Sequence, residues 1–113
     1  TPYSHEINLL EKRFLEENGV NVLSISGALL ERSQDTPKIP PETMRGYALE
    51  ADTPDADAIF ISCTGLHVDT IIEPLEKELG KPVLTSNQCG LWGSLRELGV
   101  MDKIPGLGRL FDY

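Results

Sequence analysis

The sequence contains few of the features that assign a protein to a common functional class. Its 113 residues include two cysteines, Cys63 and Cys89, which are too few for a disulfide framework and too far apart for a CxxC redox or zinc motif. No run of about 18 apolar residues is present, and the first residues do not show the pattern of a secretory signal. The nucleotide-binding motifs GxGxxG and GxxxxGKS/T are also absent. We therefore expect a soluble, cytoplasmic protein with reduced thiols.

Positive charge is scarce as well. Ten Lys and Arg residues stand against 18 Asp and Glu residues, which gives a net charge of -8. A surface of this kind repels nucleic acid and anionic lipid, so we expect neither nucleic acid nor a membrane as a partner. Glu73, Glu76 and Glu78 are spread around a predicted helix with Lys77, which is typical of a solvated face. Since no cluster of metal-ligating side chains is visible, we expect no metal and no cofactor.

The sequence does contain a regular alternation of apolar runs and helical patterns. Three runs predict buried strands, namely Val20–Ile25, Ala58–Ser62 and Pro82–Thr85. Apolar residues with helical spacing occupy 7–14, 44–51, 68–79 and 91–98. This alternation predicts an α/β fold with a Rossmann-like parallel sheet flanked by helices, in which the carboxyl ends of the strands share one edge.

The start of the chain does not match a complete α/β unit. Thr1-Pro2-Tyr3 leads directly into a helix that Ser4 can cap, whereas an α/β unit normally begins with a strand. Three strands would leave one place in the sheet unpaired, and an open strand edge allows another segment to add there. We interpret residues 1–104 as one α/β domain whose first strand is missing, and therefore as a portion of a larger protein.

Cys63 is the strongest candidate for a catalytic residue. It follows the most apolar run and precedes Thr64 and Gly65, shortly before a predicted helix that starts near Val68. Backbone N–H groups in such a turn favour an anion, and the same field favours a thiolate over a thiol. The alternative is a small buried side chain without a chemical role, because cysteine is common at the ends of buried strands.

Other polar groups are expected at the same edge of the sheet. Thr85-Ser86-Asn87-Gln88 follows the last strand, where these residues line a pocket or, alternatively, Ser86 or Asn87 caps the next helix. The Tyr3 phenol lies where the missing strand would end and can donate a hydrogen bond to a carboxylate. We expect Cys89 to be a packing residue and His67 to face solvent at a helix start, and neither histidine, His5 or His67, is taken as catalytic.

Several of these stretches, taken together, resemble a known family. They are Phe60 to Leu66, Ile72 to Glu76 and Gly80 to Gln88, with Thr1-Pro2-Tyr3, Glu6 and Asn8 at the start and Pro105 to Asp112 at the end. Their order and spacing resemble the aspartate/glutamate/hydantoin racemase superfamily. The most similar branch contains maleate cis-trans isomerase, arylmalonate decarboxylase and the ectoine-utilisation racemase-like proteins. Proteins of this branch have two similar α/β domains that face each other, and the chain resembles the second.

The resemblance implies roles for four residues. Cys63 would be the catalytic cysteine of the C-terminal domain, which donates or abstracts a proton at a substrate carbon. Backbone amides of Thr64 and Gly65 and the Tyr3 phenol would bind a carboxylate of a small carboxylic or dicarboxylic acid. The implied protein is a cofactor-independent isomerase, racemase or decarboxylase, most like maleate cis-trans isomerase, and forms a homo-oligomer.

The family's other catalytic position lies in the first domain, so one-thiol and two-thiol chemistry both stay open. We expect residues 105–113 to form a tail that packs back toward that first domain, and we expect the 113-residue chain alone to be inactive. A different class of function also stays open, in which the chain is a non-catalytic α/β module that binds a small anion or a partner protein. A cysteine hydrolase is a weaker alternative, because no histidine is placed as its general base.

Overall fold

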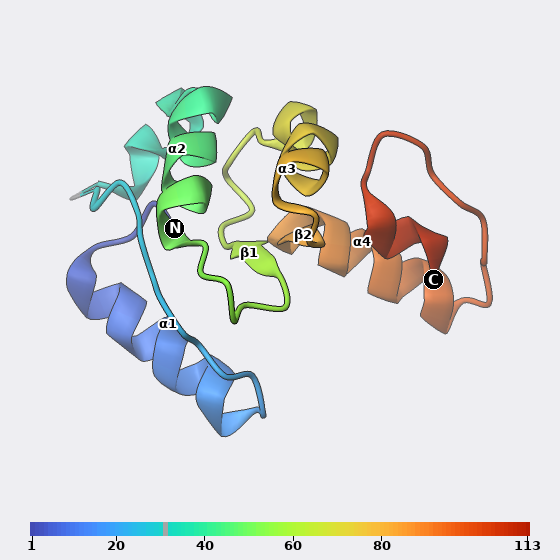
Figure 1. The fold of residues 1–113 in the computed structure, drawn as a ribbon, viewed down its shortest axis with the longest axis horizontal. Coiled ribbons are helices and arrows are strands. Elements are labelled where there is room, and N and C mark those ends of the chain that lie inside the picture. The colour runs from blue at the N-terminus through green and yellow to red at the C-terminus, as the bar shows by residue number, and fades with distance from the viewer. Residues whose placement is uncertain (31) are drawn as a thin grey trace.

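The computed structural model describes residues 1–30 and 32–113, which form an α/β arrangement of short strands and helices (Figure 1). Two predicted strands are confirmed as β1 (Ile59–Ile61) and β2 (Val83–Thr85). They pair in parallel, with Ile59 opposite Val83 and Ile61 opposite Thr85. Helix α3 (Ile72–Leu79) connects them, so both strands end at the same edge, as the sequence predicted.

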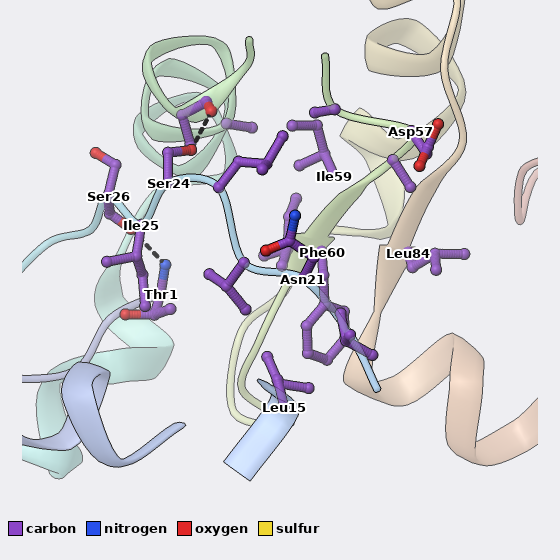
Figure 2. A pocket seen from close by; sticks show the side chains of 18 of the residues that line it. Thr1, Leu15, Asn21, Ser24, Ile25, Ser26, Asp57, Ile59, Phe60 and Leu84 are labelled. Atoms are coloured by element: carbon purple, nitrogen blue, oxygen red, sulfur yellow. Dashed lines mark hydrogen bonds between the residues drawn. The ribbon is translucent and has the colours of Figure 1, made fainter. Parts of the chain in front are cut away.

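The third predicted strand, Val20–Ile25, is wrong. Within the described residues 20–25 the chain is assigned no strand, and Val20 and Leu23 are 50% and 46% exposed. A cavity of about 820 Å³ is lined by this segment and by β1 (Figure 2). A strand needs a neighbour for its backbone hydrogen bonds, and neither side of this segment supplies one along 20–25.

The helices follow the predicted periodicity, but the helix expected to start near Val68 begins at Ile72, after a 3-10 turn. They are α1 (His5–Glu17), α2 (Pro41–Ala51), α3 and α4 (Ser86–Glu97), with short 3-10 helices at Ser33–Lys38, Asp69–Ile71 and Arg109–Asp112. Ser4 caps α1 by accepting a hydrogen bond from the Ile7 amide, and Pro41 is the first residue of α2. None of the described helices is long and apolar enough to cross a membrane.

The core lies between α2, α3 and the two strands. Its most buried side chains are those of Met44, Ile72, Leu75, Val83 and Phe111. Figure 1 shows α2 and α3 above the strands, while α4 leads away from β2. This packing fixes the positions of β1 and β2 and therefore of the residues that directly follow them.

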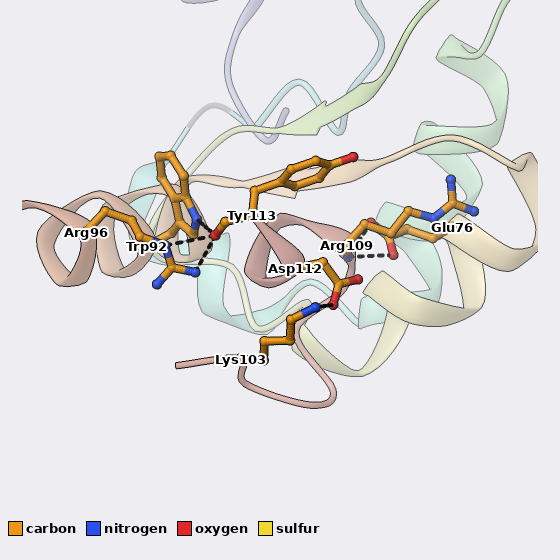
Figure 3. Close-up of polar contacts among 7 residues, drawn as sticks. All are labelled: Glu76, Trp92, Arg96, Lys103, Arg109, Asp112 and Tyr113. Atoms are coloured by element: carbon orange, nitrogen blue, oxygen red, sulfur yellow. Dashed lines mark hydrogen bonds and ion pairs between the residues drawn. The ribbon is translucent and has the colours of Figure 1, made fainter. Parts of the chain in front are cut away.

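The C-terminal residues 105–113 pack on this same domain. Glu76 of α3 is buried, so the prediction that it lies on a solvated face is wrong. Its carboxylate accepts hydrogen bonds from the backbone amides of Val83 and Arg109, both at 3.1 Å. Trp92 and Arg96 of α4 donate to the Tyr113 backbone oxygen (Figure 3). The expected contact of this tail with a first domain stays a prediction.

Candidate active site

Cys63 has an unusual backbone conformation at the end of β1. Its φ angle is 129°, in a region that residues with a side chain rarely adopt. The residue is half-buried, two positions beyond the last residue of β1. Such a conformation persists only where surrounding contacts impose it, and it is found at functional sites more often than elsewhere. Sequence reasoning placed the thiol at this edge but gave no sign of the positive φ angle.

The first turn of α4, directly after β2, provides contacts that hold this conformation. The Cys63 amide donates a hydrogen bond to Ser86 Oγ at 3.0 Å, and Asn87 Nδ2 donates to the Thr64 carbonyl at 3.2 Å. The prediction that Ser86 or Asn87 caps the next helix is therefore wrong. Thr85 caps α4 instead, because its Oγ1 accepts from the Gln88 amide at 3.1 Å. The expectation that this polar segment lies near Cys63 is confirmed.

Gly65 lies against the Cys63 thiol. A Cβ atom added at Gly65 would be 3.7 Å from Cys63 Sγ and 3.3 Å from Thr36 Cγ2. A side chain at position 65 would therefore crowd Thr36 and contact the sulfur. Thr36 is buried in the 3-10 helix Ser33–Lys38, and sequence reasoning missed it. No apolar period or turn motif in that segment could have identified Thr36.

Tyr3 is brought next to Cys63, as the sequence predicted. Burial is the largest cause that raises the pKa of the Tyr3 phenol, and hydrogen bonding to Cys63 and the charge of that residue act in the same direction. Hydrogen bonding to Ser62 lowers the pKa, and the resulting value is about 12. The phenol is consequently protonated at neutral pH and available as a donor. Tyr3 and Gly65 therefore both lie close to Cys63.

Asn8 holds the segment that carries Tyr3. Its side chain is buried, accepts a hydrogen bond from Thr1 Oγ1 and donates to the Tyr3 carbonyl at 3.4 Å. Since Asn8 lies on α1, the first helix is linked directly to the position of the phenol.

Comparison with known proteins identifies the family. The family model described as arylmalonate decarboxylase matches residues 1–111. The chain belongs to the arylmalonate decarboxylase family. It is 36% identical to arylmalonate decarboxylase of Bordetella bronchiseptica, covering 99% of this chain and 48% of the relative. It is 29% identical to maleate isomerase of Nocardia farcinica, covering 97% of this chain and 44% of the relative. The chain thus spans about half the length of these curated relatives.

Solved structures give the same result. A Gly-to-Cys mutant of arylmalonate decarboxylase in a sulfate-associated form matches with a TM-score of 0.86 and 30% identity, over 99% of this chain and 49% of that one. A mutant of Nocardia farcinica maleate cis-trans isomerase, with a covalently bound succinylcysteine intermediate, matches with a TM-score of 0.91 and 28% identity. That match covers 97% of this chain and 45% of the other. The expected family branch and fold class are confirmed.

The two histidines and the second cysteine have less support as catalytic groups of this arylmalonate decarboxylase family member. His5 and His67 are both exposed. Cys89 is half-buried, and burial raises the pKa of its thiol, which keeps the sulfur protonated. Among the described residues no group of three or more His, Cys, Asp or Glu side chains is arranged to hold a metal ion. Of the two thiols, that of Cys63 is therefore the one that lies among polar groups at the sheet edge.

Proposed function

We propose that the full-length protein is a cofactor-independent isomerase or decarboxylase that acts beside a carboxylate of a small carboxylic or dicarboxylic acid. The observation that carries this proposal is that Tyr3 and Gly65 each lie beside Cys63, which has a positive φ angle. In this proposal Cys63 is the catalytic residue that transfers a proton. Racemisation belongs to the same proposed chemistry, because it also moves a proton at a carbon next to a carboxylate.

Binding of a carboxylate would use neutral donors. The Tyr3 phenol donates one hydrogen bond, and the backbone amides of Thr64 and Gly65 donate others to the same group. Loss of a proton or of CO₂ beside that carboxylate leaves an electron pair that spreads over its oxygens as an enediolate. Donors already aimed at those oxygens lower the barrier, since they need no reorganisation when the charge develops.

Proton transfer would complete each reaction. In decarboxylation, the carbon–CO₂ bond breaks, its electrons enter the enediolate, and the Cys63 thiol delivers its proton to carbon. The resulting thiolate recovers a proton from water. In racemisation or isomerisation, a second group on the opposite side removes the proton or adds to the double bond, while Cys63 handles the proton on its own side. The succinylcysteine in the Nocardia farcinica isomerase mutant shows covalent cysteine chemistry in that relative.

The second group would come from outside this chain. We propose that a facing N-terminal domain of the full-length protein supplies it, in a cytoplasmic homo-oligomer, and that tail residues 105–113 also contact that domain. The half-length match to both curated relatives supports this division. We therefore expect no turnover from the 113-residue chain alone.

The test compares three full-length proteins: the unaltered enzyme, Cys63→Ser and the matched control Cys89→Ser. Each is given maleate, arylmalonates and panels of small amino and hydroxy acids, and product formation and deuterium exchange at the α-carbon are followed. We expect exchange and turnover with at least one substrate, loss of at least about 100-fold in Cys63→Ser, and little change in Cys89→Ser. Equal activity of Cys63→Ser and the unaltered enzyme, or no activity with any substrate, would contradict the proposal and favour a binding module.

A further inference from the structure

The loop that follows β1 is held by two successive residues of α4. Ser86 Oγ accepts from the Cys63 amide at 3.0 Å, and Asn87 Nδ2 donates to the Thr64 carbonyl at 3.2 Å. Ser86 and Asn87 are the first two residues of α4, whose start is capped by Thr85. The helix therefore offers one acceptor and one donor, and the loop offers the matching N–H and C=O groups.

A third hydrogen bond lies within the loop itself. The Leu66 amide donates to the Cys63 carbonyl at 3.3 Å. Among the described residues no hydrogen-bond partner is found for the amides of Thr64 and Gly65. The carbonyls of Cys63 and Thr64 are thus bonded, whereas the two amides that follow them are left for another acceptor.

The Asn87 contact determines where the Gly65 amide points. The Thr64 carbonyl and the Gly65 N–H belong to one peptide group, and no described peptide bond is cis. In a planar trans peptide group the C=O and the N–H point in opposite directions. Because the Thr64 carbonyl points toward Asn87 at the start of α4, the Gly65 N–H points away from that side chain.

The same contact makes the Gly65 N–H a stronger donor. A carbonyl that accepts a hydrogen bond polarises its peptide group, and the N–H of that group then donates more strongly. Gly65 also lies against the candidate catalytic thiol, since a Cβ atom there would be 3.7 Å from Cys63 Sγ. The donor that Asn87 orients is thus carried by a neighbour of the sulfur.

We propose that Asn87 is a positioning residue that aims the Gly65 amide at the substrate carboxylate. This inference rests on the proposed function, which assigns the amides of Thr64 and Gly65 to that carboxylate. Asn87 acts through the peptide group between these two residues and need not touch the substrate. Without the Asn87 side chain this peptide group can rotate, so the donor no longer meets the oxygen on which enediolate charge develops.

Kinetics of Asn87→Ala in the full-length protein test this role, with Asn18→Ala as the matched control. Asn18 Nδ2 also donates to a backbone carbonyl, that of Phe14, at 2.8 Å at the exposed end of α1. We expect Asn87→Ala to lower kcat at least about 10-fold with the substrate that the unaltered enzyme turns over. Equal kcat in the two variants would overturn the inference and leave the proposed function intact.

Thermal unfolding separates positioning from a purely structural role. The Asn87 contact is exposed, so water can replace it and its loss costs little stability. We expect each variant to change the melting temperature of the full-length protein by less than about 2 °C. A much larger fall for Asn87→Ala than for Asn18→Ala would overturn the inference in favour of a structural role.

Nuclear magnetic resonance tests the same role without turnover. The nitrogen chemical shift of Gly65 reports on the hydrogen bond that the Thr64 carbonyl accepts, and a titration with malonate reports on the Gly65 amide as a donor to a carboxylate. We expect Asn87→Ala to move this nitrogen resonance and to weaken malonate binding at least about fivefold, while Asn18→Ala changes neither.

The two kinds of failure are distinct in this titration. Absence of turnover with malonate still bound at Gly65 would contradict the proposed function alone. Equal malonate affinity in the unaltered protein and Asn87→Ala would overturn the role of Asn87. No response of the Gly65 amide to malonate in either protein would also overturn it, because that amide would then bind no carboxylate.

Discussion

The Cys63 amide donates a hydrogen bond to Ser86 Oγ at 3.0 Å, which joins the loop after β1 to the first turn of α4. Cys63 lies at a φ angle of 129°, and its amide is held by this contact with the Ser86 side chain. A strained conformation needs such support from neighbouring groups. Ser86 is therefore a positioning residue for the candidate catalytic thiol, although it need not touch a substrate.

Substitution of Ser86 tests this role. In Ser86→Ala the Cys63 amide loses its partner, so we expect a loss of about 1 kcal/mol in the free energy of unfolding and a fall in kcat. Ser94→Ala is the matched control, since Ser94 Oγ donates to the Gly90 carbonyl on an exposed part of α4. Urea unfolding and steady-state kinetics of the full-length protein measure both. Ser86→Thr retains the hydroxyl, and its failure to recover kcat above the alanine variant would argue against positioning through this bond.

The contact between Gly65 and Thr36 gives a second prediction. In Gly65→Ala the new methyl group lies 3.3 Å from Thr36 Cγ2, which is tighter than most real contacts. We expect a loss of about 1 kcal/mol in stability and reduced kcat/KM, because the methyl group also approaches Cys63 Sγ.

The matched variant is Thr36→Ser, which removes the Cγ2 methyl group. We expect the double variant Gly65→Ala/Thr36→Ser to be more stable than the sum of the single effects predicts. Strict additivity in urea unfolding would show that the two positions do not press on each other.

The pKa of Tyr3, about 12, predicts how the phenol titrates. Burial and the neighbouring Cys63 both favour the neutral phenol, so ionisation of Tyr3 occurs well above the usual value of 10. Because the folded-state pKa is raised, the stabilisation is complete below pH 10 and is lost as the pH rises from about 10 through 12.

Ultraviolet titration of the full-length protein, with Tyr3→Phe subtracted, measures this ionisation. In Cys63→Ala the charge and the hydrogen bond of the thiol are absent, so we expect the Tyr3 pKa to fall toward 10. An unchanged titration in Cys63→Ala would show that Tyr3 and Cys63 do not interact.

Sequence reasoning predicted the parts of this molecule that depend on local pattern. The apolar run around Ile59 and the spacing of Ile72, Leu75 and Leu79 predicted β1 and α3, and both are confirmed. The predicted strand at 20–25 is wrong because a strand depends on its neighbour as well as on its own residues. Apolar pattern alone therefore identified a segment with the propensity of a strand but not its pairing.

In the candidate site, too, local pattern predicted some residues and missed others. Tyr3 and Cys63 were predicted at one edge because parallel strands end together. Thr36 and the supporting role of Ser86 depend on contacts between segments far apart in the chain, and no local pattern encodes them. The φ angle of Cys63 is equally a product of the surrounding contacts, since cysteine itself disfavours that conformation.

The buried carboxylate of Glu76 gives the last prediction. Both of its oxygens accept from the Arg109 amide, at 3.1 and 3.0 Å, and one also accepts from the Val83 amide. In Glu76→Gln an NH₂ group replaces one acceptor and faces an N–H group, in a side chain that is 5% exposed. We expect a loss of about 2 kcal/mol in stability and loosening of tail 105–113.

Glu73→Gln is the control for Glu76→Gln, since the exposed Glu73 carboxylate accepts from the Gly106 amide at 3.0 Å on the same tail. Water can replace the hydrogen bond to the Gly106 amide, so we expect Glu73→Gln to lose less than about 0.5 kcal/mol in the free energy of unfolding. Urea unfolding measures both variants, and Trp92 fluorescence reports on the tail because Trp92 Nε1 donates to the Tyr113 backbone oxygen. Comparable losses in the two variants would mean that burial of Glu76 adds nothing to the attachment of the tail.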